Sequence, residues 1–336
     1  MKLTLPSIVG IITFILSAVS LNAQTVVCLG DNATVCAGSS VTIQDCNPGN
    51  NNAGIVLTNP STVSLSDDSW SPIVNIGFTF NFYGVNYTQC TIGSNGLISF
   101  NLANANGYCP WALGGVAPLP NAGFAAARNT QMAAYHDMNP SIWASPNGEI
   151  IYKTVGAAPN RQFIVLYSNI MDYGPGGYCT YMAVIMNETA NSFEYHIGFK
   201  AMSPTWNGGL AIQGSENSPG TVAHMTPGRN NTQWAVLVPE AKIWVPTSPG
   251  NTSAYTISPI PYSLMLSPSS TYEWANTQNA TTWPYNAGNL TINPVLPAPP
   301  DSIGYFLTVD GQACNIGTGG ASDTTWIIPV SSSVSA

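Results

Sequence analysis

The chain has 336 residues, of which 45% are hydrophobic and only 7% are charged. An ordinary globular domain has roughly 25% charged residues, so the polar surface here must consist mainly of Asn, Thr, Ser, Gln and backbone groups. Asp and Glu number 15 against 7 Lys and Arg, which leaves a net charge of -8. So few cations cannot neutralise nucleic-acid phosphates or anionic lipid headgroups, which argues against both classes of partner.

Residues 1–23 are typical of a secretory signal peptide. Lys2 precedes an apolar run from Ile8 to Leu21, and the small residue Ala23 stands at the expected cleavage point. No second apolar span of transmembrane length follows. We therefore expect a secreted or cell-surface protein without a membrane span.

After this segment, short runs of alternating, β-branched or aromatic residues recur between Gly, Pro, Asn and Ser, as in antiparallel strands. The predicted strands are 41–44, 76–83, 89–92, 97–101, 150–154, 161–170, 179–187, 192–199, 209–213, 234–238 and 305–309. Their spacing predicts an all-β protein made of antiparallel β-sandwich domains. The segment 122–134, rich in Ala, favours either a helix or a loop across one sheet. Linkers or turns are expected at 47–54, 245–250 and 294–300.

Asn95-Gly96, between two apolar runs, is a strong hairpin signal. A two-residue type I′ turn needs positive φ at both central residues, which Asn and Gly tolerate. We therefore expect Gly96→Val to destabilise the domain, because a β-branched residue is disfavoured in the left-handed region.

Seven cysteines follow the signal peptide, none of them in a C-x-x-C spacing, so disulfides are favoured over metal binding in an exported protein. The disulfide candidates are Cys28, Cys36, Cys46, Cys109, Cys179 and Cys314. Cys90 is either a further partner or the odd thiol. An odd count leaves one thiol free or paired between chains, which permits an intermolecular disulfide or self-assembly.

Several segments follow one another in a distinctive order, namely GFTFNFYG (77–84), YTQCTIGSNGLISF (87–100), MAAYHDMNP (132–140), GEIIYKTV (148–155), NRQFIVLYSNIMDY (160–173), TYMAVIMNETANSFEYHIG (180–198) and GGLAIQGSENSPGTVA (208–223). This series resembles the nidogen-like extracellular β domain over residues 58–246. Each piece is an ordinary amphipathic strand, and only the series is distinctive. The resemblance implies a nidogen-like sandwich.

Flanking segments resemble the Ig-like or PKD-like modules of Bacteroidota surface proteins. TVCAGSSVTI (34–43) resembles their first strands, and STYEW (270–274) and GYFLTVDGQAC (304–314) resemble their second half. This implies an Ig-like sandwich, formed by residues 24–57 and 247–336, into which the nidogen-like domain is inserted. Cys36 and Cys314 would then be neighbours. Two tandem domains with an N-terminal arm are the alternative.

Three constellations could carry chemistry. Tyr135-His136-Asp137 joins an imidazole to a carboxylate, but no G-x-S-x-G or other nucleophile signature accompanies it. Glu188 and Glu194 flank a predicted turn and could form a glycosidase pair. The three histidines are too dispersed for zinc.

No cofactor is expected, with a structural Ca²⁺ as the one candidate. Asp67-Asp68 and Asp137-Met138-Asn139 are short oxygen-rich segments, but neither has the order of an EF-hand loop. Solvated turn carboxylates are the simpler interpretation.

Aromatic residues beside Pro, Gly or Asn suggest exposed rings, and rings together with Asn and Gln amides suit a neutral sugar surface. The tryptophans are Trp70, Trp111, Trp143, Trp206, Trp234, Trp244, Trp274, Trp283 and Trp326. Aromatics that cap the sandwich ends are the alternative. The candidate ligand-site residues are His136, Asp137, Trp111, Trp143 and Trp206.

The sequence favours a non-catalytic extracellular adhesion protein that binds a glycan or protein surface. The resemblance implies the N-terminal part of a modular Bacteroidota adhesin of the gliding-associated or type IX-secreted kind. A secreted carbohydrate-active hydrolase and a self-assembling filament subunit are the alternatives.

Overall fold

A computed structural model describes residues 55–143, 148–174, 178–203, 205–248 and 251–263, together with the backbone of shorter strands outside these ranges. Every regular element described is a β-strand or a single 3₁₀ turn, so the all-β prediction is confirmed. No helix among the described residues is long and apolar enough to cross a membrane. The predicted signal peptide, Cys28, Cys46, Cys314 and the side chain of Cys36 lie outside the described residues.

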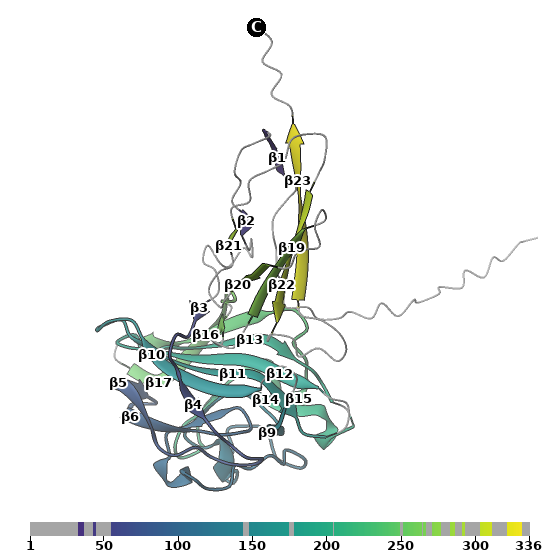
Figure 1. The fold of residues 1–336 in the computed structure, drawn as a ribbon. Helices are drawn as coiled ribbons and strands as arrows, with labels where there is room; N and C mark the ends of the chain where they lie inside the picture. The colour runs from purple at the N-terminus through teal and green to yellow at the C-terminus, as the bar shows by residue number, and fades with distance from the viewer. Residues whose placement is uncertain are drawn as a thin grey trace, which may run out of the picture.

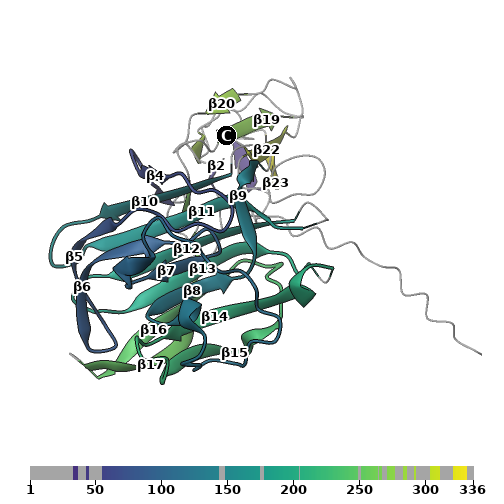
Figure 2. The ribbon, with the colours of Figure 1, turned by 90° about the horizontal axis from the view of Figure 1, so that it is seen from below.

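Two antiparallel sheets pack face to face as a sandwich (Figure 1, Figure 2). The eight-stranded sheet has the order β17 (Asn251–Ile260), β16 (Glu240–Ser248), β13 (Phe193–Lys200), β12 (Cys179–Asn187), β11 (Gln162–Asp172), β10 (Glu149–Val155) and β4 (Ser61–Val63), with β9 (Met138–Trp143) paired to β11. The six-stranded sheet has the order β15 (Ala223–Gln233), β14 (Leu210–Glu216), β8 (Thr130–Tyr135), β7 (Leu97–Ser99), β6 (Val85–Ile92) and β5 (Val74–Phe82).

The core between the sheets is aromatic. In β5 the residues alternate between buried and exposed, so that its phenylalanines face the opposite sheet. Phe82 lies 4.7 Å from Phe100 and 5.9 Å from Phe193 between ring centroids, and Phe193 stacks on Trp244 at 5.4 Å. The expectation that the tryptophans are exposed is therefore wrong for Trp244, and also for Trp70 and Trp234, because their rings fill the interior.

The outer face of the six-stranded sheet is covered by the long connection between β7 and β8. All six residues of β8 are buried, since one face meets the main core and the other meets a second apolar cluster. That cluster includes Trp70, Cys109, Leu113 and Tyr135. The connection contains two 3₁₀ turns, η1 (Leu102–Asn104) and η2 (Ala125–Ala127), and η3 (Asn207–Gly209) precedes β14.

The helix considered for residues 122–134 is wrong. This segment is a loop with one 3₁₀ turn, followed by β8, which pairs with β7 on one side and β14 on the other. Helix propensity is a weak preference, and burial on both faces of a central strand overrides it.

Asn95 and Gly96 do lie in a hairpin turn, between β6 and β7, but its geometry differs from the prediction. The Gly93 N–H donates to the Leu97 carbonyl, and only Gly96 has positive φ, at 81°. This is a three-residue loop with a left-handed glycine at its end. The two-residue pattern with positive φ at both positions occurs instead at Tyr83 and Gly84, between β5 and β6.

The polar strands near the end of the sandwich were missed. β15 contains Pro227 and Gly228 and is half-buried or exposed at every residue but Thr226, while the predicted strand at 234–238 is only an isolated bridge at Val236. β15 lies at a sheet edge and pairs with β14 through two register shifts, so it needs no apolar alternation. The segment 245–250 belongs to the β16–β17 hairpin, where Ser248 pairs with Asn251.

Strands from the two ends of the chain pair with one another. β1 (Ala33–Cys36) runs parallel to β23 (Ala321–Val330) in a five-stranded sheet that also holds β22 (Ile303–Asp310), β19 (Thr271–Asn276) and β20 (Trp283–Tyr285) (Figure 1). Two smaller pairs join β2 (Ile43–Gln44) to β21 (Thr291–Ile292) and β3 (Ile55–Val56) to β18 (Met265–Leu266).

Among the described cysteines, Cys109 corrects a prediction. Cys109 and Cys90 are buried free thiols, whereas Cys179 is disulfide-bonded. Cys109 is not a disulfide partner because its side chain packs in the apolar cluster beside Trp70. Burial raises the pKa of the Cys109 thiol to about 12, which keeps it protonated.

Candidate functional site

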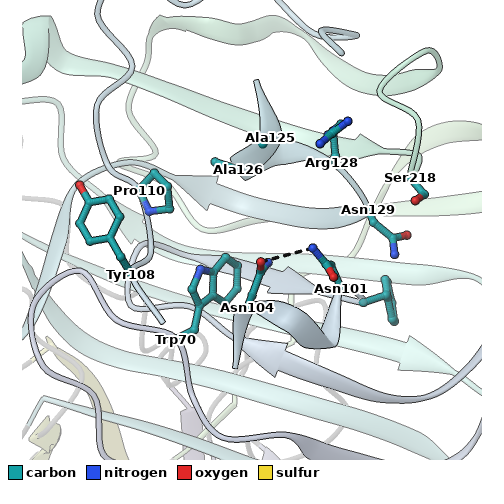
Figure 3. Close-up of a pocket in the computed structure, with 11 residues that line it drawn as sticks. Trp70, Asn101, Asn104, Tyr108, Pro110, Ala125, Ala126, Arg128, Asn129 and Ser218 are labelled. Carbon is teal, nitrogen blue, oxygen red and sulfur yellow. Dashed lines mark hydrogen bonds between the residues drawn. The ribbon is translucent and has the colours of Figure 1, made fainter. Parts of the chain in front are cut away.

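An open cavity of about 460 Å³ lies on the outer side of the six-stranded sheet (Figure 3). We call it the Trp70 pocket. Its lining residues are Trp70, Phe100, Asn101, Asn104, Tyr108, Pro110, Ala125, Ala126, Arg128, Asn129 and Ser218. They come from the segment before β5, the β7–β8 connection and the β14–β15 turn. The lining therefore combines aromatic rings and three amides with one charged side chain.

Hydrogen bonds hold the walls of this pocket in place. The Trp70 N–H donates to the Gly107 carbonyl over 3.0 Å, and Trp70 itself is only 3% exposed. Asn104 Nδ2 donates to Ser99 Oγ over 3.0 Å, and Asn104 Oδ1 accepts from Asn101 Nδ2. Tyr108, at 63% exposure, leaves its ring open to a ligand at the rim.

His136 lies in a buried polar cluster and not in a catalytic triad. Its Nε2 is 2.9 Å from Asp172 Oδ1 and 3.2 Å from the Thr180 hydroxyl, and its Nδ1 is 2.8 Å from the Ala134 carbonyl oxygen. In a triad the carboxylate and the nucleophile contact opposite ring nitrogens. Here both contact Nε2, and Thr180 has no exposed surface, so its hydroxyl cannot meet a substrate.

Most of the candidate ligand-site residues gather around Trp206. The Trp206 Nε1–H donates to Asp137 Oδ2 over 2.8 Å, and its ring lies 5.8 Å from Trp111 and 4.9 Å from Tyr173. His136 and Asp137 line a small cavity together with Trp206. Trp143 ends β9, and its side chain lies outside the described residues.

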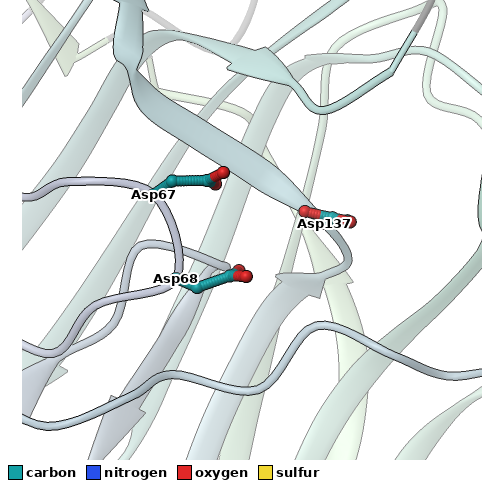
Figure 4. A group of neighbouring side chains, drawn as sticks. All are labelled: Asp67, Asp68 and Asp137. Atoms are coloured by element: carbon teal, nitrogen blue, oxygen red, sulfur yellow. The ribbon is translucent and has the colours of Figure 1, made fainter.

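Three carboxylates converge beside this group (Figure 4). One oxygen or more from each of Asp67, Asp68 and Asp137 lies within 4.8 Å of the others. Asp68 accepts from Asn95 Nδ2 over 2.9 Å, so the turn predicted from Asn95-Gly96 reaches the cluster. The two acidic segments considered for Ca²⁺ thus meet in space, whereas Asn139 turns its Oδ1 to the Ser141 N–H and hydroxyl.

Burial and like charge perturb these acids. Burial raises the pKa of Asp137, the hydrogen bond from Trp206 opposes this rise and the charges of Asp68 and Asp67 add to it, so that the pKa is about 7. Burial also raises the pKa of Asp67 and of Asp68 above the usual range for a carboxyl group. Each carboxylate is therefore destabilised in the absence of a positive charge.

Glu188 and Glu194 do not have the properties of a glycosidase pair. Arg161 hydrogen-bonds both oxygens of Glu188 and lowers its pKa to about 2. Burial raises the pKa of Glu194, but hydrogen bonds from His196 and Asn187 bring it below the usual value. The general acid of a glycosidase requires a raised pKa, and neither group has one.

Several site residues carried no sequence signal. Arg128, Asn129 and Ser218 lie far from Trp70 in the chain and look like ordinary loop residues. Lys200 is buried, donates to the carbonyls of Ala201 and Trp234, and lies near Asp172 and His136 in the small cavity. Only the sheet topology brings these groups together.

The comparisons with known proteins gave one finding. No curated protein and no solved structure matches the chain. The family described as NIDO related matches residues 50–259, which include both sheets of the sandwich up to the end of β17. Because this match covers more than half of the chain, the protein belongs to the NIDO-related family.

Proposed function

We propose that this protein is an extracellular adhesion module that binds a glycan in the Trp70 pocket without catalysis. Membership of the NIDO-related family indicates an extracellular, non-catalytic role. Adhesion, the glycan ligand and the location at the cell surface are the further steps of the proposal.

The composition of the Trp70 pocket carries the proposal. Sugars present apolar C–H faces that stack on aromatic rings, and hydroxyls that pair with side-chain amides. Tyr108 supplies an exposed ring, and Asn101, Asn104 and Asn129 supply the amides. Arg128 is the single charged lining residue, which suits a neutral glycan or one with a single acidic group.

A hydrolase is the competing function, and the geometry of the candidate catalytic groups speaks against it. The His136 cluster lacks an exposed nucleophile, and Glu188 is paired with Arg161. Asp137, whose pKa is raised to about 7, accepts a hydrogen bond from Trp206 Nε1–H and lies beside two further acids, with no base in a triad arrangement among the described residues. We therefore expect binding without turnover.

A glycan array probed with the labelled full-length protein tests the proposal. Tyr108→Ala and Asn104→Ala should each weaken binding about fivefold or more, because each removes a stacking or hydrogen-bonding group worth about 1 kcal/mol or more. Val238→Ala is the matched control, since Val238 is 74% exposed and does not line the pocket. Equal binding by all variants, or cleavage of a bound glycan by the parent, would contradict the proposal.

We also propose that the terminal strands form one Ig-like or PKD-like module of a Bacteroidota adhesin, with the NIDO-related domain inserted in it. The pairings of β1 with β23 and of β2 with β21 support insertion, because each joins a segment before the family match to a segment after it. Cleavage at a protease site engineered into residues 47–54 tests this arrangement. Under reducing conditions the N-terminal piece should co-elute with the remainder, whereas tandem domains would release it.

A further inference from the structure

We propose that Asp67, Asp68 and Asp137 bind a divalent cation, with Ca²⁺ preferred. The cluster joins the segment before β5 to the turn between β8 and β9 (Figure 4). Nothing in the family assignment places a metal here, and the inference is independent of glycan binding in the Trp70 pocket.

Unpartnered buried oxygens are the observation that points to a ligand. Asp137 is 5% exposed, and its Oδ1 is buried without a hydrogen-bond partner. Asp67 Oδ1 is buried and unpartnered as well. A buried carboxylate oxygen without a partner is costly, and two such oxygens in carboxylates that converge are the arrangement that a cation would satisfy.

Charge supports the same conclusion. None of the ion pairs among the described residues includes Asp67, Asp68 or Asp137. Three converging carboxyl groups without a neighbouring cation repel one another when ionised. A divalent cation would balance most of this charge and hold all three in the ionised form.

The second oxygens of two carboxylates are already held by neighbouring donors. Asn95 Nδ2 donates to Asp68 Oδ1, and Trp206 Nε1 donates to Asp137 Oδ2. Metal-binding carboxylates commonly have such outer partners, which fix their orientation. Asn95 is itself fixed, because its Oδ1 accepts from the Met138 N–H over 2.9 Å. Asn95 and Trp206 are therefore positioning residues for the cation.

The donor set selects the metal. All three groups offer oxygen, which Ca²⁺ and Mg²⁺ prefer, and none offers the nitrogen or sulfur typical of zinc sites. Ca²⁺ accepts oxygen ligands in a flexible geometry, whereas Mg²⁺ demands a near-ideal octahedron and gives up its water ligands reluctantly, so a site that gathers three carboxylates suits Ca²⁺ better.

The cation would also brace one wall of the Trp70 pocket. The Asp68 carbonyl accepts from the Cys109 N–H over 2.8 Å. Ser69 and Trp70 follow Asp68 in the chain, and Ser69 forms a β-bridge with Tyr108, which precedes Cys109. Fixing Asp68 therefore fixes the segments that carry Trp70 and Tyr108.

The test uses the EDTA-treated full-length protein and two probes, CaCl₂ and Tb³⁺. Extracellular Ca²⁺ modules bind in the range of about 10⁻⁴ to 10⁻³ M. At about a hundred times the Kd, Ca²⁺ should raise the Tm by about 5 to 10 °C. Tb³⁺ should luminesce on tryptophan excitation, because Trp206 contacts Asp137, and Ca²⁺ should displace it while Mg²⁺ does so poorly.

Asp67→Asn, Asp68→Asn and Asp137→Asn should each weaken Ca²⁺ binding at least tenfold. Asn keeps the shape of Asp and removes one of three like charges, so each variant should melt at or above the parent temperature in EDTA. Glu188→Gln is the control, since it removes a carboxylate outside the cluster and should leave the Ca²⁺ response unchanged. Trp206→Phe should lower the affinity by about tenfold in calorimetry.

Two results would overturn the inference. One is a parent protein with no Tm shift and no Tb³⁺ luminescence up to about 10 mM Ca²⁺, ten times the weakest extracellular modules. The other is a Ca²⁺ response that persists in the Asp→Asn variants. Because these measurements contain no glycan, they fail or succeed separately from the proposed function.

Discussion

Gly96→Ala tests how tightly the β6–β7 hairpin is packed. Gly96 has φ of 81°, and a Cβ built there would lie 2.6 Å from the Ala134 carbonyl oxygen and 2.9 Å from Met182 Cε. The left-handed conformation costs a non-glycine residue about 1–2 kcal/mol, and forcing an extra carbon into a packed site costs about 1–3 kcal/mol more. We therefore expect a loss of about 2–5 kcal/mol in the free energy of unfolding, and a larger loss for Gly96→Val.

Gly84→Ala separates the two contributions. Gly84 has nearly the same φ, 82°, but a Cβ there would meet nothing within 4 Å. Gly84→Ala should therefore lose only the free energy that the left-handed backbone conformation costs a non-glycine residue. Both substitutions change the unfolded chain in the same way, so that effect cancels in the comparison.

Urea and thermal unfolding of the parent and both variants give the measurement. At about 2–4 °C per kcal/mol for a domain of this size, Gly96→Ala should lower the Tm by about 4–20 °C. If Gly96→Ala and Gly84→Ala melt together, the steric argument is wrong. An unchanged Tm for Gly96→Ala would refute the conformational argument too.

Three further predictions concern buried polar groups. Burial raises the pKa of Glu216 to about 7 from 4.5, so the native state holds a proton that the unfolded state loses, and stability should fall by roughly 3 kcal/mol at most as pH rises from about 4.5 to 7. In measurements of Tm against pH, Glu216→Gln should make this fall smaller, and an unchanged slope would contradict the raised pKa of Glu216. Asn95→Ala should cost about 2–4 kcal/mol in urea unfolding, because it leaves the buried Met138 N–H without its acceptor, and a cost below about 1 kcal/mol would show that water replaces the side chain. Cys90 and Cys109 should react with a thiol reagent only after guanidinium unfolding, since both are buried with raised pKa; the double Cys→Ala variant is the control, and rapid labelling of the native protein would count against the burial.

β5, β11 and β12 were predictable because burial imposes a local pattern. β5 alternates residue by residue, and β11 and β12 are nearly continuous apolar runs flanked by turn residues. A strand with such a pattern can be predicted from its own residues, without knowledge of the strands that pair with it. β15 could not be predicted in this way, because it is an edge strand that contains Pro227 and Gly228 and lacks an alternation of buried and exposed residues.

The candidate site was predictable only in fragments. Asp67-Asp68 and Asp137 were recognised as separate oxygen-rich segments, and Trp206 as a ligand-site residue, but nothing local relates residues seventy positions apart. The same holds for Asn95. The sequence predicted a hairpin turn at this residue, but not that its side chain would hydrogen-bond to both Asp68 and Met138.

By itself, the sequence determined the fold class, several buried strands and the scarcity of cationic side chains, because each depends on composition or on neighbours within a few residues. Tertiary structure alone decided which carboxylates converge, which tryptophans are buried and which cysteines remain thiols. The physical reason is that hydrophobic patterning specifies which face of a strand is buried. The side chains that meet across or beside the sheets follow from strand order and register, which the whole chain sets together.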